Sequence, residues 1–481
     1  MQIKDKHLTL GCVLIYIWLW FLIPFYGTAQ LSTRHYIPPI PGQYSQDQVF
    51  YTESYLYIST PYPEARFTIK PVGQLANNWI TGVVTSTNSF RVKVSNDEVG
   101  ADPSNFENNY TFTDKGFEVT ADREIFVSLR IKANNHAGAL VSKGINGFGK
   151  DFRVGGMERQ DINDFSFFSL IATENNTLVE FFNPDDQLEA LNINGSLPTS
   201  IVLNKNESYI ALFNGDDCER FIGTHIKSQK NIIVNTGSIV GSFSNEIIDS
   251  PDFFEGEEDG YQDGQGERDF GYLIGSDIGF DQLVSLDANV DATNYLLIKG
   301  DSFNSIENAL VIANENGTTI TLNGDSNSSI DLEAGDNIFI EGDEFFKNSD
   351  SNFESLSITS NNNIYVFQGT GKKGDLTRTR QNGQKIHFYG ANQGMFFVPP
   401  LSCTSVGDVK SIAQIDKVDE NSNFSGSLFV LSSYGSSVKV NGDDILSLSN
   451  VVFDPGPIQT SNADYQIHRI DDLVGDVSIV G

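Results

Sequence analysis

One twelve-residue pattern occurs three times along the chain, at residues 116–127, 223–234 and 355–366. In each copy apolar residues alternate with polar ones, stop at a short polar turn, and continue as a run of β-branched or aromatic residues. This pattern is typical of a β-hairpin with one buried face. We therefore expect a chain built from copies of one β module, and such modules usually present surface rather than assemble one catalytic pocket.

A second phrase repeats in step with the first. It occupies residues 171–179 and 312–320, more loosely residues 430–438, and in a degenerate form residues 58–67. Each copy predicts strand, polar turn and strand, with Asn or Gly at the tip where a positive φ is required. Asn-Gly pairs mark a further tight turn at Asn194-Gly195, Asn323-Gly324 and Asn441-Gly442. The phrases indicate four modules spaced by roughly 110 to 140 residues, longer than the units of short-period solenoids.

The modules are predicted at residues 48–132, 136–242, 271–371 and 390–481. Helix signals are nearly absent, because few windows keep a helical period without Gly, Pro or an Asn cluster, so the predicted class is all-β. Two arrangements are open. Tandem β-sandwich-like modules are favoured because each copy holds about six strands, whereas a closed propeller-like ring has blades of about four. The last pattern stops just before Gly481, so we expect the fourth module to be truncated.

The first 29 residues have the features of a cleaved signal peptide. Lys4 and Lys6 precede an apolar stretch at residues 8–26, and small residues precede Gln30. Cleavage is therefore predicted after Ala29. An uncleaved membrane anchor is the alternative, because the apolar stretch is long. Both readings imply export, and we expect a protein that is secreted or held on the outer cell surface.

Net charge limits the classes of partner, and cysteine content limits the possible disulfides. The formal net charge is −32, which repels nucleic-acid phosphates and anionic lipid surfaces. We therefore expect no nucleic-acid partner and no membrane insertion after signal cleavage. Cys12 leaves with the signal peptide, and Cys218 and Cys403 remain as one candidate disulfide. They lie in different modules, so two free thiols are an equally open reading.

Residues 253–270, between the second and third modules, form an acidic and glycine-rich segment. We interpret it as an exposed loop. Its carboxylates are weak candidates for calcium binding, because calcium prefers oxygen ligands, but the spacing of an EF-hand is absent. The candidate ligands are Glu257, Asp259, Asp263 and Glu267. No other cofactor is predicted.

Residues 372–389, between the third and fourth modules, carry the opposite charge, with five Lys or Arg inside fourteen residues. An exposed hairpin with Asn382-Gly383 at its turn is the favoured interpretation. Docking of this basic insert on the acidic body, or contact with an acidic glycan or partner, is the alternative.

No motif predicts a catalytic centre. Residues 144–150 have the spacing of a phosphate-binding loop, but Asp151 stands where Ser or Thr must bind magnesium, and no helix is predicted to follow. No zinc motif occurs, and the scattered histidines are assigned to packing or surface hydrogen bonds: His136, His225, His387 and His468. Acidic residues are too numerous for a glycosidase pair to be nominated. The prediction is a protein without enzymatic activity.

Two aromatic rows are candidates for stacking on sugar rings. They are Tyr51, Tyr55 and Tyr57 on one strand face, and Phe165, Phe167 and Phe168 at the start of another strand. In a β protein with 35 Phe, such rows more often belong to the core.

Three phrases carry a resemblance to a known family. Val-Phe-Gln-Gly at residues 366–369, the segment 392–403 and Phe-Gly-Lys-Asp-Phe at residues 148–152 resemble the N-terminal region of the IgGFc-binding protein family. The resemblance covers most of the mature chain from about Tyr51 onward, through structural phrases rather than active-site signatures. It implies an extracellular, surface-presented β protein. It also implies a bacterial source, because exported homologues are common in gliding bacteria with type IX secretion, but it does not imply antibody binding.

We predict an exported scaffold that presents loops to a glycan or protein ligand, because loops vary while sheets hold their position. The rival hypothesis is a secreted carbohydrate-active enzyme or its glycan-binding accessory region, which requires a cleft with paired carboxylates beside aromatic residues. A third hypothesis is a structural surface-layer component, which requires self-association.

Overall fold

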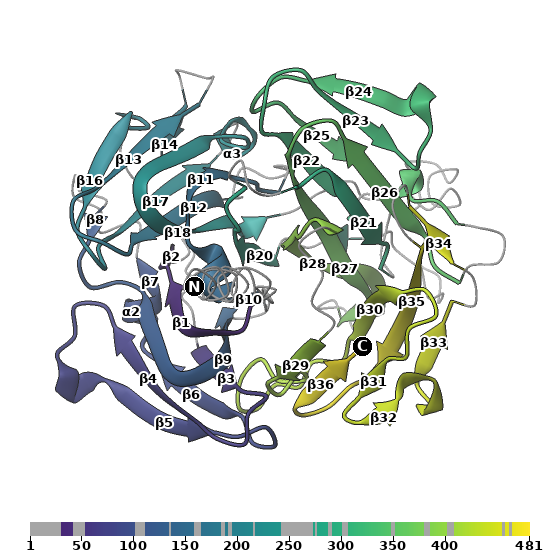
Figure 1. Ribbon diagram of the computed structural model, residues 1–481, viewed down its shortest axis with the longest axis horizontal. Coiled ribbons are helices and arrows are strands. Elements are labelled where there is room, and N and C mark those ends of the chain that lie inside the picture. The colour runs from purple at the N-terminus through teal and green to yellow at the C-terminus, as the bar shows by residue number, and fades with distance from the viewer. Residues whose placement is uncertain are drawn as a thin grey trace, which may run out of the picture.

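The computed structural model describes residues 30–41, 53–101, 111–133, 136–157, 165–183, 188–190, 195–214, 217–241, 273–274, 277–286, 291–300, 306–347, 352–379, 385–401, 408–454, 457–460 and 464–481. Across these residues the fold is all-β, as predicted (Figure 1). The described helices have only three or four residues each.

The strands form four consecutive repeats. Repeat 1 contains β1 (Ser32–Ile37), β2 (Ile40–Pro41), β3 (Glu53–Ser59), β4 (Ala65–Pro71), β5 (Ile80–Val84), β6 (Phe90–Val94), β7 (Gly100–Ala101), β8 (Thr111–Phe112), β9 (Phe117–Ala133) and β10 (His136–Val141). Repeat 2 contains β11 (Gly149–Arg153), β12 (Phe165–Ala172), β13 (Thr177–Phe182), β14 (Glu189–Ala190), β15 (Gly195–Ser196), β16 (Ser200–Leu203), β17 (Ser208–Asn214), β18 (His225–Gly241), β19 (Leu273–Ile274) and β20 (Asp277–Gln282).

Repeat 3 contains β21 (Asn294–Ile298), β22 (Ala309–Ala313), β23 (Thr318–Leu322), β24 (Ser329–Leu332), β25 (Asn337–Ile340), β26 (Ser355–Ser360), β27 (Ile364–Thr379) and β28 (Lys385–Val398). Repeat 4 contains β29 (Asp408–Ile412), β30 (Ser427–Ser433), β31 (Lys439–Val440), β32 (Asp443–Asp444), β33 (Val451–Phe453), β34 (Ile458–Gln459), β35 (Asp464–Asp471) and β36 (Val477–Val480). The short helices are η1 (Ala76–Asn78), α2 (Asn96–Val99), η3 (Gly144–Gly147), α3 (Asp217–Arg220), η5 (Ser326–Ser328), η6 (Gly342–Glu344) and η8 (Ile445–Ser447).

Equivalent strands have equivalent places in each repeat. The opening strand is β1, β11, β21 or β29. Strand A is β3, β12, β22 or β30, and strand B is β4, β13, β23 or β31. Strand C is β5, β16, β24 or β32, and strand D is β6, β17, β25 or β35. The closing segment is β9, β18, the pair β26 and β27, or β36.

One pairing scheme unites the repeats. Strand B pairs antiparallel with strand C and with the first part of the closing segment. The opening strand pairs with that same first part. Strand A pairs antiparallel with strand D and, in repeats 1 to 3, with the second part of the closing segment. β10, β20 and β28 then pair with the other edge of that second part.

The three sequence copies that revealed the repetition occupy the closing segments. Their last residues lie at matching places, since Val127 pairs with Ile58, Val234 with Leu170 and Val366 with Val311. The valines at these positions are fully buried. The repeated pattern therefore encodes one structural unit, as predicted.

Backbone conformation at the turn tips also follows the prediction. The residues between strands A and B with positive φ are Asn176 (51°), Gly317 (66°) and Gly435 (79°). Both residues of Asn323-Gly324 and of Asn441-Gly442 also have positive φ, which is the requirement of a tight hairpin turn. Asn194 lies outside the described residues.

The four repeats lie around a common centre (Figure 1), which is the closed, propeller-like arrangement of the two that the sequence left open. Repeats 1 and 2 share one apolar cluster that contains Leu140 and Phe280. Repeats 2 and 3 share a larger cluster that contains Phe221 and Phe367. These two junctions are continuous cores rather than surface contacts.

The remaining junctions close the ring. Repeats 3 and 4 share a smaller cluster that contains Leu296 and Ile467. Repeats 4 and 1 meet where Ala413 packs with Tyr55 and Tyr57. Every repeat therefore contacts both of its neighbours. Repeat 4 packs against repeat 1, and the ring is closed.

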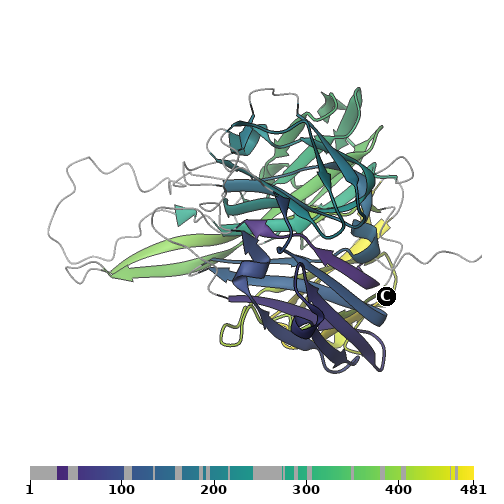
Figure 2. The ribbon, with the colours of Figure 1, turned by 90° about the vertical axis from the view of Figure 1, so that its left-hand side faces the viewer.

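The basic insert, residues 372–389, lies in the long hairpin of β27 and β28. These strands pair from Val366 with Val398 as far as Thr379 with Lys385. Figure 2 shows this hairpin projecting from the body of the ring. The predicted hairpin is therefore confirmed, and Asn382-Gly383 lies outside the described residues.

The turn tips give a direct test of the repeat. Gly317→Ala is expected to lower the free energy of unfolding by about 1 kcal/mol, because an L-residue is strained at positive φ. A Cβ at Gly317 would meet no atom within 4 Å. The loss in the free energy of unfolding therefore measures backbone strain and not a steric clash. Gly394→Ala is the matched control, since its added Cβ meets only an oxygen of Thr370 at 3.9 Å. Urea denaturation of both variants checks the prediction, and equal losses would contradict it.

Candidate binding surfaces at the repeat junctions

The sheet of β3, β6 and β9 in repeat 1 has two unlike faces. Successive side chains on a strand point to opposite faces, and one face buries apolar residues in the core: Leu56, Ile58, Leu129 and Ile131. The other face carries two tyrosines and four cations: Tyr55, Tyr57, Arg91, Lys93, Arg130 and Lys132. Register confirms the shared face, because Tyr55 lies opposite Lys93 and Arg130 on its two neighbouring strands.

Cations lie over the tyrosine rings on this face. The Cζ atom of Arg130 lies 3.9 Å from the ring centroid of Tyr57. Arg91 Cζ and Lys93 Nζ lie 5.7 and 6.0 Å from the ring centroid of Tyr55. Such contacts are electrostatically favourable and gain strength when water is excluded. Tyr55 and Tyr57 are only 2% and 1% exposed, so repeat 4 must exclude that water.

Residues 413–422 of repeat 4 cover this face. Arg130 donates hydrogen bonds to the carbonyl oxygens of Ala413 at 2.5 Å, Gln414 at 2.6 Å and Lys417. Burial lowers the pKa of Arg130, but a guanidinium stays charged in proteins. Three backbone carbonyls therefore solvate one buried positive charge, and they fix this segment on the first repeat.

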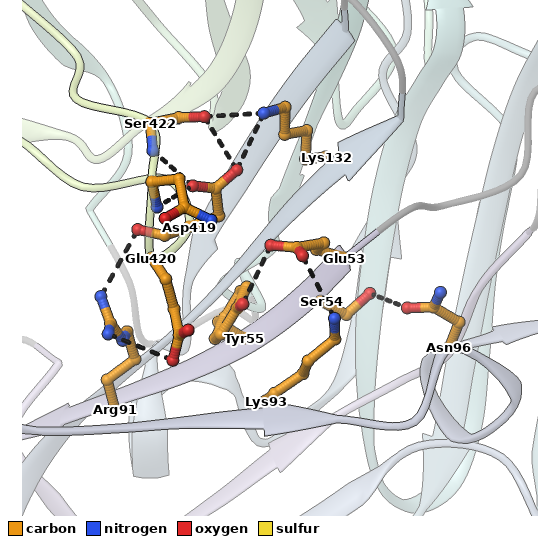
Figure 3. Close-up of polar contacts among 11 residues, drawn as sticks. Glu53, Ser54, Tyr55, Arg91, Lys93, Asn96, Lys132, Asp419, Glu420 and Ser422 are labelled. Atoms are coloured by element: carbon orange, nitrogen blue, oxygen red, sulfur yellow. Dashed lines mark hydrogen bonds and ion pairs between the residues drawn. The ribbon is translucent and has the colours of Figure 1, made fainter.

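Asp419 forms the second anchor (Figure 3). Its Oδ2 atom lies 2.8 Å from Lys132 Nζ, and Oδ1 accepts the backbone amide of Asn421 at 2.6 Å. Ser422 adds its amide and its hydroxyl. Burial alone would raise the pKa of Asp419, but the bonds from Lys132, Ser422 and the backbone amides outweigh it and hold this pKa well below its usual range.

Weaker polar contacts extend the junction. Arg91 lies 3.5 Å from Glu420 Oε1, at the edge of the group drawn in Figure 3. Ser89 donates its hydroxyl to Asp476 at 2.6 Å, and Ser59 donates to the Ser411 carbonyl at 2.9 Å. The junction of repeats 4 and 1 is therefore polar, unlike the apolar clusters at the other junctions.

An apolar cavity of about 410 Å³ lies beside these anchors. Repeat 1 lines it from β9 and β10, with Phe126, Val127, Ala137, Ala139 and Val141. Repeat 4 lines it from β29 and the segment beyond, with Val409, Ile412, Ile415, Val418 and Phe424. Among the residues that the structure describes, its lining contains no Asp or Glu. Ligand sites commonly have volumes of about 300–1,000 Å³ and apolar walls, so this cavity is large enough to hold a ligand.

A second cavity, of about 240 Å³, lies between repeats 3 and 4 and has a different chemistry. Lys299, Lys347 and Arg469 line it together with Phe353 and Phe429. The two phenylalanine rings meet edge to face, with centroids 5.9 Å apart.

Two of these cations are already paired. Lys299 Nζ lies 2.6 Å from Glu354, and Arg469 Nε lies 3.2 Å from Asp471. Lys347 forms no ion pair with any residue that the structure describes. One cation is thus available to a ligand, whereas the aromatic rings are largely covered, since Phe353 is only 6% exposed and Phe429 is half-buried.

The aromatic rows belong to packing rather than to exposed stacking platforms. Tyr55 and Tyr57 are covered by repeat 4, and Phe167 and Phe168 are fully buried in the cores. Tyr51 lies outside the described residues, as does the side chain of Phe165. The core interpretation is therefore confirmed for the four side chains that the structure describes.

Residues 144–150 do not form a phosphate-binding loop, as predicted. Residues 144–147 form η3, and the strand β11 follows instead of a helix. Asp151 Oδ1 lies 2.7 Å from His225 Nε2, and burial lowers the pKa of His225. His468 is buried and stacks on Phe453, in agreement with its assigned packing role. His136 lies on β10, and the side chain of His387 is outside the described residues.

Several predicted sites fall outside the described residues. They are the calcium candidates Glu257, Asp259, Asp263 and Glu267, the cleavage position after Ala29, Cys403 and the side chain of Cys218. Within the part of the chain that the structure describes, no three His, Cys, Asp or Glu side chains are grouped to hold a metal ion.

Sequence reasoning missed the cationic face of repeat 1. Its signal was present in Phe90-Arg91-Val92-Lys93-Val94 and Leu129-Arg130-Ile131-Lys132, where cations alternate with apolar residues on two strands. Such alternation marks one buried and one polar face. It does not reveal which distant segment covers the polar face.

Arg130 is expected to hold the junction of repeats 4 and 1. Arg130→Met removes the donors and leaves buried carbonyl groups without partners, which cost about 1–3 kcal/mol each. We expect the free energy of unfolding to fall by about 3 kcal/mol, measured by urea denaturation, with faster amide exchange in residues 413–417. Arg66→Met is the control, because Arg66 pairs with Glu64 on the exposed surface. The same loss in both variants would rule out this role.

Asp419 is expected to make the junction sensitive to acid. Since its folded-state pKa lies below the unfolded value, its contribution is complete above the ordinary pKa of 3.8 and declines as the pH falls from there. The difference in unfolding free energy between wild type and Asp419→Asn should therefore shrink by about half or more between about pH 5 and pH 2. Denaturation series across this range measure the difference. Asp343→Asn, at an exposed position, should show no such change, and a constant Asp419→Asn difference would refute the assignment.

The chain is similar to one known protein family. The sequence model of the family described as IgGFc binding protein matches residues 138–475, from within β10 to the residues just before β36. No curated protein matches the chain. Within the described residues, no helix has the length and apolar character needed to cross a membrane. Because the match covers more than two thirds of its length, this chain belongs to the IgGFc binding protein family.

Proposed function

We propose that the protein is an exported, non-enzymatic binding scaffold on a bacterial surface, and that it holds an acidic glycan in the cavity between repeats 3 and 4. The family is named for binding and not for a catalysed reaction. Four mutually supporting repeats keep the junctions between them fixed in shape, which suits recognition by preformed sites.

The class of ligand is proposed from the residues that line the cavity between repeats 3 and 4. Lys347 is exposed and offers a charge to a carboxylate or sulfate group, and the half-buried Phe429 adds an apolar contact for a sugar ring. Lys299 and Arg469 add cations that are already held in place by ion pairs. Glu354 and Asp471 offset two of these charges, so Lys347 is the cation that favours an anionic ligand at that point of a chain of net charge −32.

The rival hypothesis of a carbohydrate-active enzyme requires two carboxylates across a scissile bond. Counting described residues alone, the cavity of about 410 Å³ has no carboxylate in its lining, and the cavity of about 240 Å³ has one, Glu354. Glu354 is moreover paired with Lys299. These linings support binding without hydrolysis.

Export and calcium remain proposals that rest on the sequence. The signal peptide with cleavage after Ala29 implies export, and the resemblance to exported homologues implies secretion or surface display. The acidic segment with Glu257, Asp259, Asp263 and Glu267 offers oxygen ligands of the kind that calcium prefers. Neither nucleic acid nor membrane lipid suits the charge of the chain.

Glycan-array binding of the chain from Gln30 onward tests the proposal, with and without calcium, together with a hydrolysis assay on each bound glycan. Retention of sulfated or uronic-acid glycans without product release is expected. Lys347→Glu should weaken this retention by about tenfold, equal to about 1.4 kcal/mol, because it reverses the charge that meets the ligand.

Lys439→Glu is the matched control, since Lys439 is exposed on β31 of repeat 4 and lies outside the cavity. It should leave retention unchanged. Release of shorter glycans would overturn the non-enzymatic assignment. Binding that survives Lys347→Glu would overturn the assignment to this cavity.

A further inference from the structure

The turn between β4 and β5 in repeat 1 is longer than its hairpin needs. It covers residues 72–79, between the end of β4 at Pro71 and the start of β5 at Ile80. In repeat 4 the equivalent strands, β31 and β32, are joined by Asn441-Gly442 alone. Since a two-residue turn is enough to close a hairpin, the fold does not account for the additional residues in repeat 1.

This longer turn displays a tryptophan on the surface. The chain has three Trp, and Trp18 and Trp20 precede the predicted cleavage site, so Trp79 is the one Trp of the mature chain. Trp79 is 39% exposed, and Leu75 of the same turn is 75% exposed. An indole has a large apolar area to bury, and it is enriched where proteins meet their partners. The exposed ring is therefore a candidate for contact with a ligand.

Two contacts hold the ring of Trp79 in place. Its Nε1 atom donates to the carbonyl oxygen of Gln74 at 3.3 Å, and Lys70 Nζ lies 5.3 Å from the ring centroid. Lys70 is itself held, because its Nζ atom lies 3.7 Å from Glu118 Oε2. A cation over one face of a ring leaves the opposite face for a ligand. Because the ring is already ordered, less conformational entropy is lost on binding.

The polar groups beside the ring are amides. Residues 72–79 include Gln74, Asn77 and Asn78, and they contain no charged side chain. Asn78 Nδ2 donates to Gln74 Oε1 at 2.9 Å, which orients both amides. Within the described residues these two amide groups make no other bond, so a donor of Gln74 and an acceptor of Asn78 remain for a ligand. Hydroxyl groups, which both donate and accept, suit such a pair.

We infer that the turn at residues 72–79 is a binding site for an uncharged sugar ring, which lies on the open face of Trp79 and bonds through its hydroxyl groups to Gln74 and Asn78. A sugar ring has an apolar face of C–H groups and a rim of hydroxyls, so it matches both parts of this surface. A protein partner fits less well, because a stable interface buries about 800 Å² on each side. The large apolar side chains exposed on this turn are those of Trp79 and Leu75 alone.

This site is separate from the cavity between repeats 3 and 4. β4 and β5 lie on the outer rim of repeat 1, across the ring from repeat 3 (Figure 1). The cavity offers the charge of Lys347, whereas the turn has no charged side chain. The inference therefore does not rest on the proposed acidic glycan, and either assignment can fail alone.

Intrinsic fluorescence of the chain from Gln30 onward tests the inference, because Trp79 is its only tryptophan. The probes are three neutral oligosaccharides, cellohexaose, mannohexaose and xylohexaose, with an oligogalacturonate as the acidic comparison. We expect at least one neutral probe to change the emission saturably and to protect the ring from quenching by acrylamide. No saturable change with any neutral probe, or a response to the oligogalacturonate alone, would overturn the inference.

Variants locate the site by titration calorimetry with the neutral probe that binds. Trp79→Ala should weaken binding by about tenfold or more. Gln74→Ala keeps the carbonyl that holds the ring but removes one hydrogen bond to the sugar, so a loss of about threefold is expected. Tyr434→Ala is the matched control, because Tyr434 is 49% exposed on repeat 4.

Both substituted rings are exposed, so neither Trp79→Ala nor Tyr434→Ala should shift the urea midpoint of unfolding. Equal losses of sugar binding in these two variants would refute the location. Lys347→Glu should leave binding of the neutral sugar unchanged, and a loss in that variant would move the sugar to the other cavity and overturn the inference.

Discussion

The pairing of one closing segment in two sheets is the constraint on which repeats 1 to 3 depend. In β9 the first part pairs with β4 and the second part with β3, and β18 does the same with β13 and β12. Because both sheets share this segment, neither forms its full ladder without it. The requirement explains why the closing segments keep the clearest sequence pattern, since a shift of one residue would turn their buried side chains outward.

The junctions between repeats use two kinds of chemistry. Large apolar clusters join repeat 1 to repeat 2 and repeat 2 to repeat 3. The return from repeat 4 to repeat 1 depends instead on one guanidinium that meets backbone carbonyls and on a buried carboxylate that meets Lys132. Breaking such a contact is costly, because the remaining partner is left buried and unpaired. The same junction contains an apolar cavity of about 410 Å³, so a strong polar contact and a ligand-sized apolar space lie side by side.

Local features were accessible from the sequence, and distant contacts were not. The turn tips at Asn176, Gly317 and Gly435 follow from residue chemistry, and the closing segments follow from alternation and repetition. Tyr55 and Tyr57 were correctly favoured as core residues, although they are covered by another repeat and not by their own. The contact of Arg130 with Ala413 joins positions 283 residues apart. No local period encodes that separation, so only three-dimensional coordinates reveal it.

Because the junctions differ in chemistry, one of them, between repeats 4 and 1, is expected to open first. Protonation of Asp419 removes a charge from the polar contacts of this junction, whereas apolar burial does not depend on the charge of a side chain. In strong acid the molecule should therefore part between its last and first repeats before the other junctions loosen. The ring would then become an open arc that keeps three joints intact, with both faces of the parted seam turned towards the medium.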